Sequence, residues 1–349
     1  MTGGASQDAV LSTNLGPVPS LRIRVAIAAV VAIGAAIITY VVLSEHPVMG
    51  ARDFTWHWRA AGILLDGKNP YELIRPTGYY PYNYGYFYPL TAAVLVLPLA
   101  LLPVIPAGIL FIAITSFLLA FVSTRTGYQR LPMFFSMPFV WSCYLVQVAP
   151  LLTAAMLAPI LSGAMCVKPN LGLGVLVYRP RLRYAIIGSA ILTGIAFAFV
   201  PSWPMDWFRE VTARPSGFYR SPVTLRGGLL LLIAVIRWRQ PEARLLLVMS
   251  LIPQNFTFVD QLPLWLVART FKESLLLAIL SWLGLLAIRF LLPPSVAPIN
   301  AMLITGPVQL MICYMPCLIM VLRRPNDGEL PAWMQPLERL ATRRRLASA

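Results

Sequence analysis

A succession of long apolar runs, separated by short connections, is the feature that most constrains this chain. One of them, residues 25–43, comes close to the roughly 20 apolar residues that a helix needs to cross a bilayer. Hydrophobic residues make up 58% of the chain and charged residues only 12%, and no soluble domain of useful size fits between the runs. The sequence therefore predicts an all-α, polytopic membrane protein, with roughly eight to eleven membrane-embedded helices, some of them incomplete.

The basic residues predict the membrane topology of this chain. The formal net charge is +15, but the arginines lie between the apolar runs. They do not form one surface on which basic and aromatic residues alternate, so nucleic acid is not an expected partner. The positive-inside rule places them on the cytoplasmic side. We expect a disordered cytoplasmic tail (1–20), a single membrane domain (21–322) and a basic cytoplasmic tail (323–349). Cytoplasmic turns are expected at Arg125 and Arg130, at Arg179, Arg181 and Arg183, at Arg237, Arg239 and Arg244, and at Arg269 with Lys272.

The same rule places the acid-bearing loops on the opposite side. These are a long first outer loop (44–88) and a second outer loop (201–224), with shorter candidates at 254–261 and 293–298. The first loop carries Asp53 just past the first span, where a charge is costly unless it has a task. This is where a membrane enzyme would place a base.

Three segments do not fit a continuous span. Residues 90–102 are too short to cross untilted, so they are expected at the interface or as a re-entrant segment. Residues 156–178 are interrupted at Lys168-Pro169-Asn170, and residues 245–268 at 253–255 and 260–261. Irregular backbone at membrane depth is tolerated where it is buried in protein or lines a wet cavity. These breaks are candidate walls of an active-site cavity.

A motif-rich stretch covers the first outer loop and the residues after it. In chain order it contains Asp53-Phe54, Trp58-Arg59-Ala60-Ala61, Leu64-Leu65, Gly67, Asn69-Pro70-Tyr71, Tyr88-Pro89-Leu90 and Leu97-Pro98-Leu99-Ala100-Leu101-Leu102-Pro103. In order and spacing these residues resemble glycosyltransferase family 87. Members of that family are GT-C membrane enzymes that use polyprenyl-phosphate sugars, typically polyprenol-phosphate mannose.

Two later segments are similar to the same family. Gln147 stands where the family has a Gly-Gln-x-Asn segment, with Val146 in place of its Gly and Ala149 in place of its Asn. Residues 168–171 look like its Lys-Pro-Gln-Leu segment. Around Pro253, where mannosyltransferases of the family often carry histidines, this chain has Asp260 and Gln261 instead. The resemblance covers about residues 50 to 200.

The resemblance implies a GT-C helical bundle in the inner membrane of a bacterium, with both termini cytoplasmic and the active site on the extracytoplasmic side. The reaction would move a sugar, mannose first among the candidates, from a polyprenyl phosphate to a glycan or glycolipid hydroxyl. Asp53 would be the general base. The alternative for Asp53 is a helix N-cap, because Asp before a periodic helical run is a favoured cap.

Several cationic or polar residues are candidate substrate ligands. Lys168 lies inside an apolar stretch and needs an anionic partner, which the donor phosphate would supply; the alternative is a cytoplasm-facing anchor. Arg52 and Arg59 are candidate phosphate ligands, and Arg59 could equally snorkel to lipid headgroups. His57, four residues after Asp53, could orient the carboxylate, contact phosphate or lie in an interfacial aromatic belt.

Acids and tyrosines complete the candidate site. Asp260 is the second candidate carboxylate. Six tyrosines occur in residues 79–88, of which Tyr82 and Tyr84 are candidates for stacking on a sugar, with an interfacial anchor as the alternative. Asp206 and Glu210 either bind acceptor hydroxyls or form a solvated loop surface.

The remaining signals are weak. The four cysteines stand in apolar surroundings and are expected to be packing residues. No cofactor and no metal site is indicated, because Asp53 has no acidic neighbour of the kind a divalent cation prefers. Membrane lipids, the lipid-phosphate donor and the acceptor are the expected partners. Two other functional classes stay open: a membrane transporter or flippase, and a catalytically inactive GT-C relative.

Overall fold

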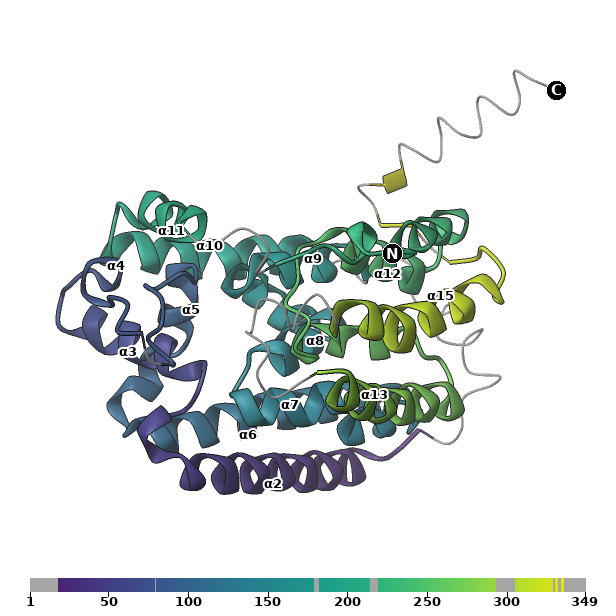
Figure 1. The fold of residues 1–349 in the computed structure, drawn as a ribbon, viewed down its shortest axis with the longest axis horizontal. Helices are drawn as coiled ribbons and strands as arrows, with labels where there is room; N and C mark the ends of the chain where they lie inside the picture. Colours follow the sequence, from purple (N-terminus) through teal and green to yellow (C-terminus); the bar gives the residue numbers. More distant parts are fainter. Residues whose placement is uncertain are drawn as a thin grey trace, which may run out of the picture.

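The computed structural model describes residues 18–78, 80–178, 182–213, 219–292, 305–328, 330–331 and 334–335. Within these residues the secondary structure is α, 3₁₀ and π helix without a strand, so the all-α prediction is confirmed (Figure 1). A single β-bridge joins Arg220 to Gln254. The expected tails and the short loop at 293–298 lie wholly or mostly outside the described residues, as do Arg179, Arg181 and Tyr79.

Five helical segments in the described part are long and apolar enough to cross a membrane. Four are the helices α2 (Leu21–Glu45), α6 (Val104–Ser123, extended by a 3₁₀ turn to Thr126), α10 (Leu182–Phe199) and α13 (Phe271–Leu291). The fifth runs from Thr305 to Leu322 and contains the π-helical turn η10 (Leu310–Tyr314) and α15 (Met315–Leu322). These segments are compatible with a multi-pass membrane protein.

Shorter helices fill the space between these spans. They are η2 (Pro47–Met49), α3 (Phe54–Leu65), α4 (Pro70–Leu73), α5 (Leu90–Leu95), η3 (Leu97–Leu101), η4 (Thr124–Thr126), η5 (Leu131–Phe135), α7 (Met137–Leu145), α8 (Ala149–Leu157), η6 (Pro159–Val167), α9 (Pro169–Tyr178), α11 (Trp203–Thr212), η7 (Pro222–Thr224), η8 (Gly228–Arg237), α12 (Pro241–Leu251) and η9 (Val259–Leu266). Many of them begin with proline in the first turn, where its missing N–H and fixed φ are tolerated.

All three predicted irregular segments are broken in the structure. Residues 90–101 form the short α5 and η3, neither of which reaches spanning length. The apolar stretch around Lys168 is divided into α8, η6 and α9, and the later stretch is divided between α12 and η9. The two breaks face one another, because the Asn170 side-chain amide donates a 2.9 Å hydrogen bond to the Pro253 carbonyl.

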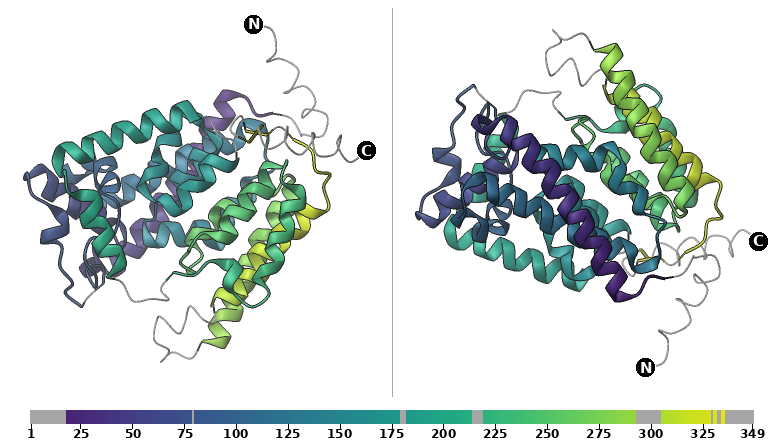
Figure 2. Two further views of the ribbon diagram at one scale, coloured as in Figure 1. Left: turned by 90° about the horizontal axis from the view of Figure 1, so that it is seen from above. Right: turned by 90° about the horizontal axis from the view of Figure 1, so that it is seen from below.

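The first two spans pack side by side and run in opposite directions (Figures 1 and 2). The Arg24 guanidinium, near the start of α2, donates a 2.7 Å hydrogen bond to the Phe121 carbonyl near the end of α6. It also lies 4.3 Å from the centre of the Phe121 ring. The chain between these helices therefore begins and ends at the opposite end of the bundle.

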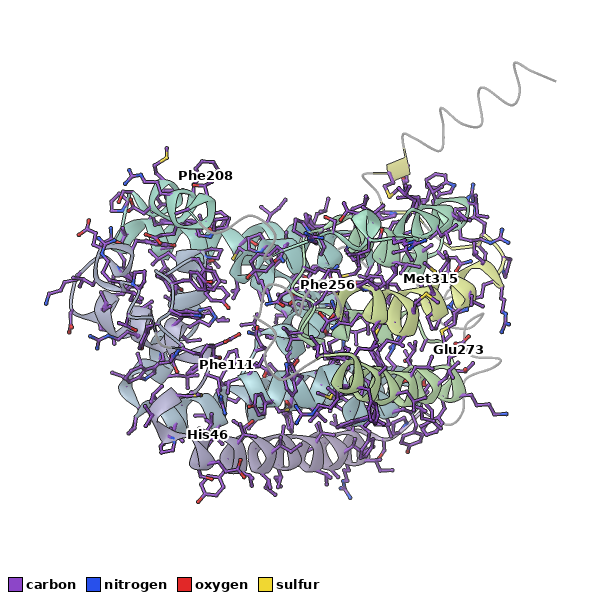
Figure 3. The ribbon with its side chains drawn as sticks, viewed as in Figure 1. His46, Phe111, Phe208, Phe256, Glu273 and Met315 are labelled. Carbon is purple, nitrogen blue, oxygen red and sulfur yellow. The ribbon has the colours of Figure 1, made fainter. Side chains whose placement is uncertain are left out.

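The two long predicted outer loops, 44–88 and 201–224, gather at that opposite end, whereas Phe256 of the shorter candidate 254–261 lies near the middle of the molecule (Figure 3). In Figure 3, His46 after α2 and Phe208 on α11 lie at one end of the molecule, and Glu273 at the start of α13 lies at the other. Within the outer-loop end, the Trp207 indole donates to the Phe87 carbonyl at 2.9 Å, which joins the second outer loop to the first.

Several of the arginines predicted on the cytoplasmic side make hydrogen bonds or ion pairs within the bundle. Arg130 and Arg244 both contact Tyr178, through its hydroxyl at 3.2 Å and its carbonyl at 3.5 Å respectively. Further ion pairs join Arg269 to Glu242 at 2.9 Å and Arg324 to Glu273 at 2.7 Å. These contacts hold the helix ends on that side of the bundle together, and the side of the membrane on which they lie stays a prediction.

Candidate functional site

Asp53 occupies the N-cap position of α3, but its side chain makes no capping hydrogen bond. Instead, Tyr80 donates its hydroxyl hydrogen to Oδ1, and the Gln147 amide donates to Oδ2. The carboxylate is half-buried and is held by two donors from distant parts of the chain. Asp53 therefore holds the N-cap position without a capping hydrogen bond from its side chain, and its carboxylate contributes to tertiary structure.

Strained backbone accompanies this arrangement. The only non-glycine residues with left-handed φ in the described part of the chain are Arg52 (+52°), Val146 (+53°) and Phe258 (+69°). Arg52 and Val146 directly precede Asp53 and Gln147, and Phe258 is two residues before Asp260. For residues with a Cβ, such conformations cost roughly 1–3 kcal/mol and concentrate at functional sites. Val146 stands where the resembled family has glycine, a residue that adopts this conformation readily.

Lys168 and Asp260 form a buried ion pair across the two helix breaks. Lys168 Nζ lies 2.6 Å from Asp260 Oδ1, and the Asn255 backbone N–H donates to Oδ2 at 3.0 Å. The side chains are 11% and 0% exposed, respectively. Lys168 is thus not a solvent-facing anchor, and the anionic partner that its burial requires is supplied by the protein. Asp260 is a buried acid paired with Lys168, and its role as a site carboxylate stays a prediction.

Lys168 also links this pair to the first outer loop, since its charge acts on both Asp53 and His57. His57 is buried, with Nδ1 3.5 Å from the Tyr86 hydroxyl and its ring centre 4.2 Å from that of Tyr88. Burial, together with the Lys168 charge, lowers the pKa of His57 to about 3. His57 is therefore a neutral imidazole at physiological pH and is packed among tyrosines.

Arg52, which precedes Asp53 in the sequence, is a buried cation. Its residue exposure is 5%, its Nη1 lies 2.8 Å from Met49 Sδ, and the guanidinium is 4.8 Å from the centre of the Tyr144 ring. Its Nε and Nη2 have no hydrogen-bond partner in the described residues. Buried N–H groups are normally paired, so these two donors lack the partner that burial usually brings.

Three further predicted ligands are Arg59, Tyr82 and Tyr84. Arg59 is exposed on α3. Tyr82 and Tyr84 are half-buried; burial raises the pKa of Tyr82, and the nearby charge of Arg59 lowers it. The tyrosine that contacts Asp53 is Tyr80, which sequence reasoning did not select.

Tyr80 is held in its protonated form. Burial and the adjacent Asp53 charge raise the pKa of its phenol well above the ordinary range, so the hydroxyl remains a donor. The density of tyrosines in residues 79–88 drew attention to this run, but nothing in its pattern ranks one tyrosine above another. Sequence analysis could not identify Tyr80 as the partner of Asp53 because the two residues are 27 positions apart in the chain.

The described residues contain no group of three or more His, Cys, Asp or Glu side chains that could hold a metal ion. Cys143, Cys313 and Cys317 are buried and Cys166 is half-buried. Their positions in the apolar interior agree with the packing role expected of them.

No protein-family model, curated protein or solved structure matches this chain. The resemblance to glycosyltransferase family 87 therefore rests on the sequence motifs.

Proposed function

We propose that this protein is a membrane glycosyltransferase of GT-C type that transfers a sugar from a polyprenyl-phosphate donor, with Asp53 as its general base. The observation that supports this role best is the state of the two candidate carboxylates. Asp260 is fully buried and paired with Lys168, whereas Asp53 is half-buried and each of its oxygens accepts one identified hydrogen bond. A base must be reachable by the proton it accepts.

In the proposed reaction, Asp53 takes the proton of an acceptor hydroxyl as that oxygen attacks the anomeric carbon of the donor sugar. The new glycosidic C–O bond forms while the bond between the anomeric carbon and the phosphate oxygen breaks. The bonding electron pair leaves with the phosphate, so the second product is the polyprenyl phosphate. Tyr80 and Gln147 hold the carboxylate in position, which lowers the cost of orienting it during reaction.

The leaving phosphate needs cations, and two lie near Asp53. Arg52 offers two unpaired N–H groups, and a guanidinium binds two phosphate oxygens at once. Lys168 contributes positive potential although Asp260 already neutralises part of its charge. In this proposal Arg52 is the direct phosphate ligand, and Lys168 acts over a longer range. Mannose is the first donor sugar to test, and a glycan or glycolipid is the acceptor class.

The deciding experiment is transfer of radiolabelled mannose from polyprenyl-phosphate mannose in membranes that contain the wild-type chain and an acceptor mixture. Asp53→Asn, at matched expression, should lower the transfer rate by about 10²- to 10⁴-fold, the usual contribution of a general base. Asp66→Asn is the matched control, because Asp66 is an exposed acid at the end of the same helix.

The outcomes separate the possibilities. Transfer by the wild type and by Asp66→Asn, with loss in Asp53→Asn at unchanged melting temperature, supports the assignment. Equal transfer by all three proteins removes Asp53 from the mechanism. No transfer by the wild type with several polyprenyl-phosphate sugars would argue against the proposed activity.

One observation favours a transporter as the second candidate. Buried ionisable pairs at facing helix breaks are a common feature of substrate and ion pathways in transporters, and Lys168–Asp260 has this placement. A transporter would move a labelled lipid-linked or small polar substrate across proteoliposomes without forming a glycosidic product. Product analysis therefore distinguishes the two functions.

A further inference from the structure

The helix α11 in the second outer loop has two chemically different faces. One face carries Trp203, Asp206, Trp207 and Glu210, and the other carries Met205, Phe208 and Val211, with Arg209 at the edge. In a water-soluble protein the apolar face would pack inward. Here, Met205, Phe208 and Val211 are 58%, 61% and 42% exposed.

The face with the acids and tryptophans contacts the first outer loop. Asn69 donates its amide to Asp206 Oδ2 at 3.1 Å, and Ser202 donates to the same oxygen at 2.7 Å. Trp207 donates to the Phe87 carbonyl, as described above. The Glu210 carboxylate lies against Gly85 so closely that a Cβ there would collide with it. Asp206 and Glu210 are thus partly shielded from water by the first outer loop. They do not form the fully solvated loop surface that the sequence left open.

The helix α11 follows closely after an apolar span, and the Phe197 ring near the end of that span lies 5.7 Å from the Trp203 ring. Only residues 200–202 separate α11 from the apolar span α10, whose last turns expose Phe197 and Phe199. α11 therefore starts where that span leaves the hydrocarbon. Arg209 Nη1 lies 3.4 Å from Asp206 Oδ1, and because the arginine side chain is 72% exposed, its guanidinium can also reach lipid phosphates. Figure 1 shows α11 at the end of the bundle, next to α10 and α4.

We infer that α11 is an interfacial helix whose Met205–Phe208–Val211 face is inserted into the phospholipid leaflet at the outer-loop end of the bundle. Its other face then fixes the first outer loop at headgroup depth. The occupant of the exposed face is lipid because α11 follows the apolar span α10 after only three residues and carries an exposed cation at the edge of this face. This inference does not depend on the activity proposed for the Asp53 site.

The test places an environment-sensitive nitrobenzoxadiazole label on single introduced cysteines in phospholipid nanodiscs. Phe208→Cys reports on α11, Lys68→Cys is an exposed polar control in the first outer loop, and Ile33→Cys is a span control on α2. The labelled wild-type chain measures background from the native cysteines, three of which are buried. Iodide quenches from water, and phosphatidylcholine with a doxyl group at carbon 5 quenches from the leaflet.

The Phe208 label should be quenched by the doxyl lipid, like the Ile33 label, and its iodide quenching constant should be about threefold or more below that of Lys68. Iodide quenching equal to that of Lys68, without doxyl quenching, would place the face in water and overturn the inference. Protection from both quenchers would mean that protein covers the face, and this outcome would overturn it too.

Discussion

The buried Lys168–Asp260 pair makes the sharpest prediction about this protein. In Asp260→Asn the side chain keeps an oxygen that can accept from the Asn255 N–H, but Lys168 loses the negative charge that lies 2.6 Å from its Nζ. Because the lysine side chain is only 11% exposed, water cannot replace that partner. The substitution therefore isolates a buried cation while changing little in shape.

The expected cost follows from the burial of both groups. Removing one member of a buried ion pair destabilises proteins by about 3–5 kcal/mol. An unfolding entropy of about 2.1 cal/mol/K per residue amounts to about 0.7 kcal/mol/K for a chain of 349 residues. The melting temperature of Asp260→Asn should therefore lie about 4–7 °C below that of the wild type.

The assay is thermal unfolding in detergent, followed by a thiol-reactive coumarin dye. Cys143, Cys313 and Cys317 are buried, so they react only after the fold opens. The matched variant is the double substitution Lys168→Met/Asp260→Asn, which removes both charges. Because neutralising a buried pair is often energetically neutral, it should melt within about 2 °C of the wild type.

Two results would refute this reasoning. A single variant that melts like the wild type would mean that Lys168 does not depend on Asp260 for its charge. A double variant that melts as low as the single one would mean that packing, not charge, is responsible. Sugar transfer by the folded double variant separates the roles further: its loss supports Lys168 as a functional cation, and its retention limits the pair to stability.

Three further predictions concern the cluster around Asp53. Arg52→Gln should raise the KM for the polyprenyl-phosphate donor by about tenfold, because it removes one charge-assisted hydrogen bond to the phosphate. Donor saturation curves with an unchanged KM would contradict the role of Arg52 as a phosphate ligand. Tyr80→Phe removes a donor to Asp53 and should lower kcat about tenfold without a matching change in melting temperature; an unaltered kcat would argue against positioning by Tyr80. His57 has a folded-state pKa of about 3 against 6.5 when unfolded, so the unfolded chain binds the extra proton and stability falls with falling pH. Between pH 7 and pH 5 this loss is about 2 kcal/mol. The fall in melting temperature over the same range should be smaller in His57→Gln than in the wild type, and equal falls would contradict this prediction.

Much of the architecture could be predicted from the sequence because it depends on local properties. The length and polarity of apolar runs locate spans such as 21–45, and proline with adjacent polar residues locates the breaks near Lys168 and Asp260. The asymmetry of arginines and acids predicted that the two long outer loops gather at one end. The sequence did not predict how the expected eight to eleven embedded helices divide between long and short ones. The described part has five long apolar segments and many short helices.

The candidate site also has features that depend on local sequence and features that depend on the fold. The sequence by itself determined that Asp53 is an acid in an unusual place and that Lys168 needs an anion, because both follow from the cost of charge next to apolar runs. Only the tertiary structure decided which residues pair with these two charged groups. Tyr80 and Gln147 lie 27 and 94 residues from Asp53, and Asp260 lies 92 residues from Lys168. Pairings over such separations are set by how the helices pack, and no local pattern encodes them.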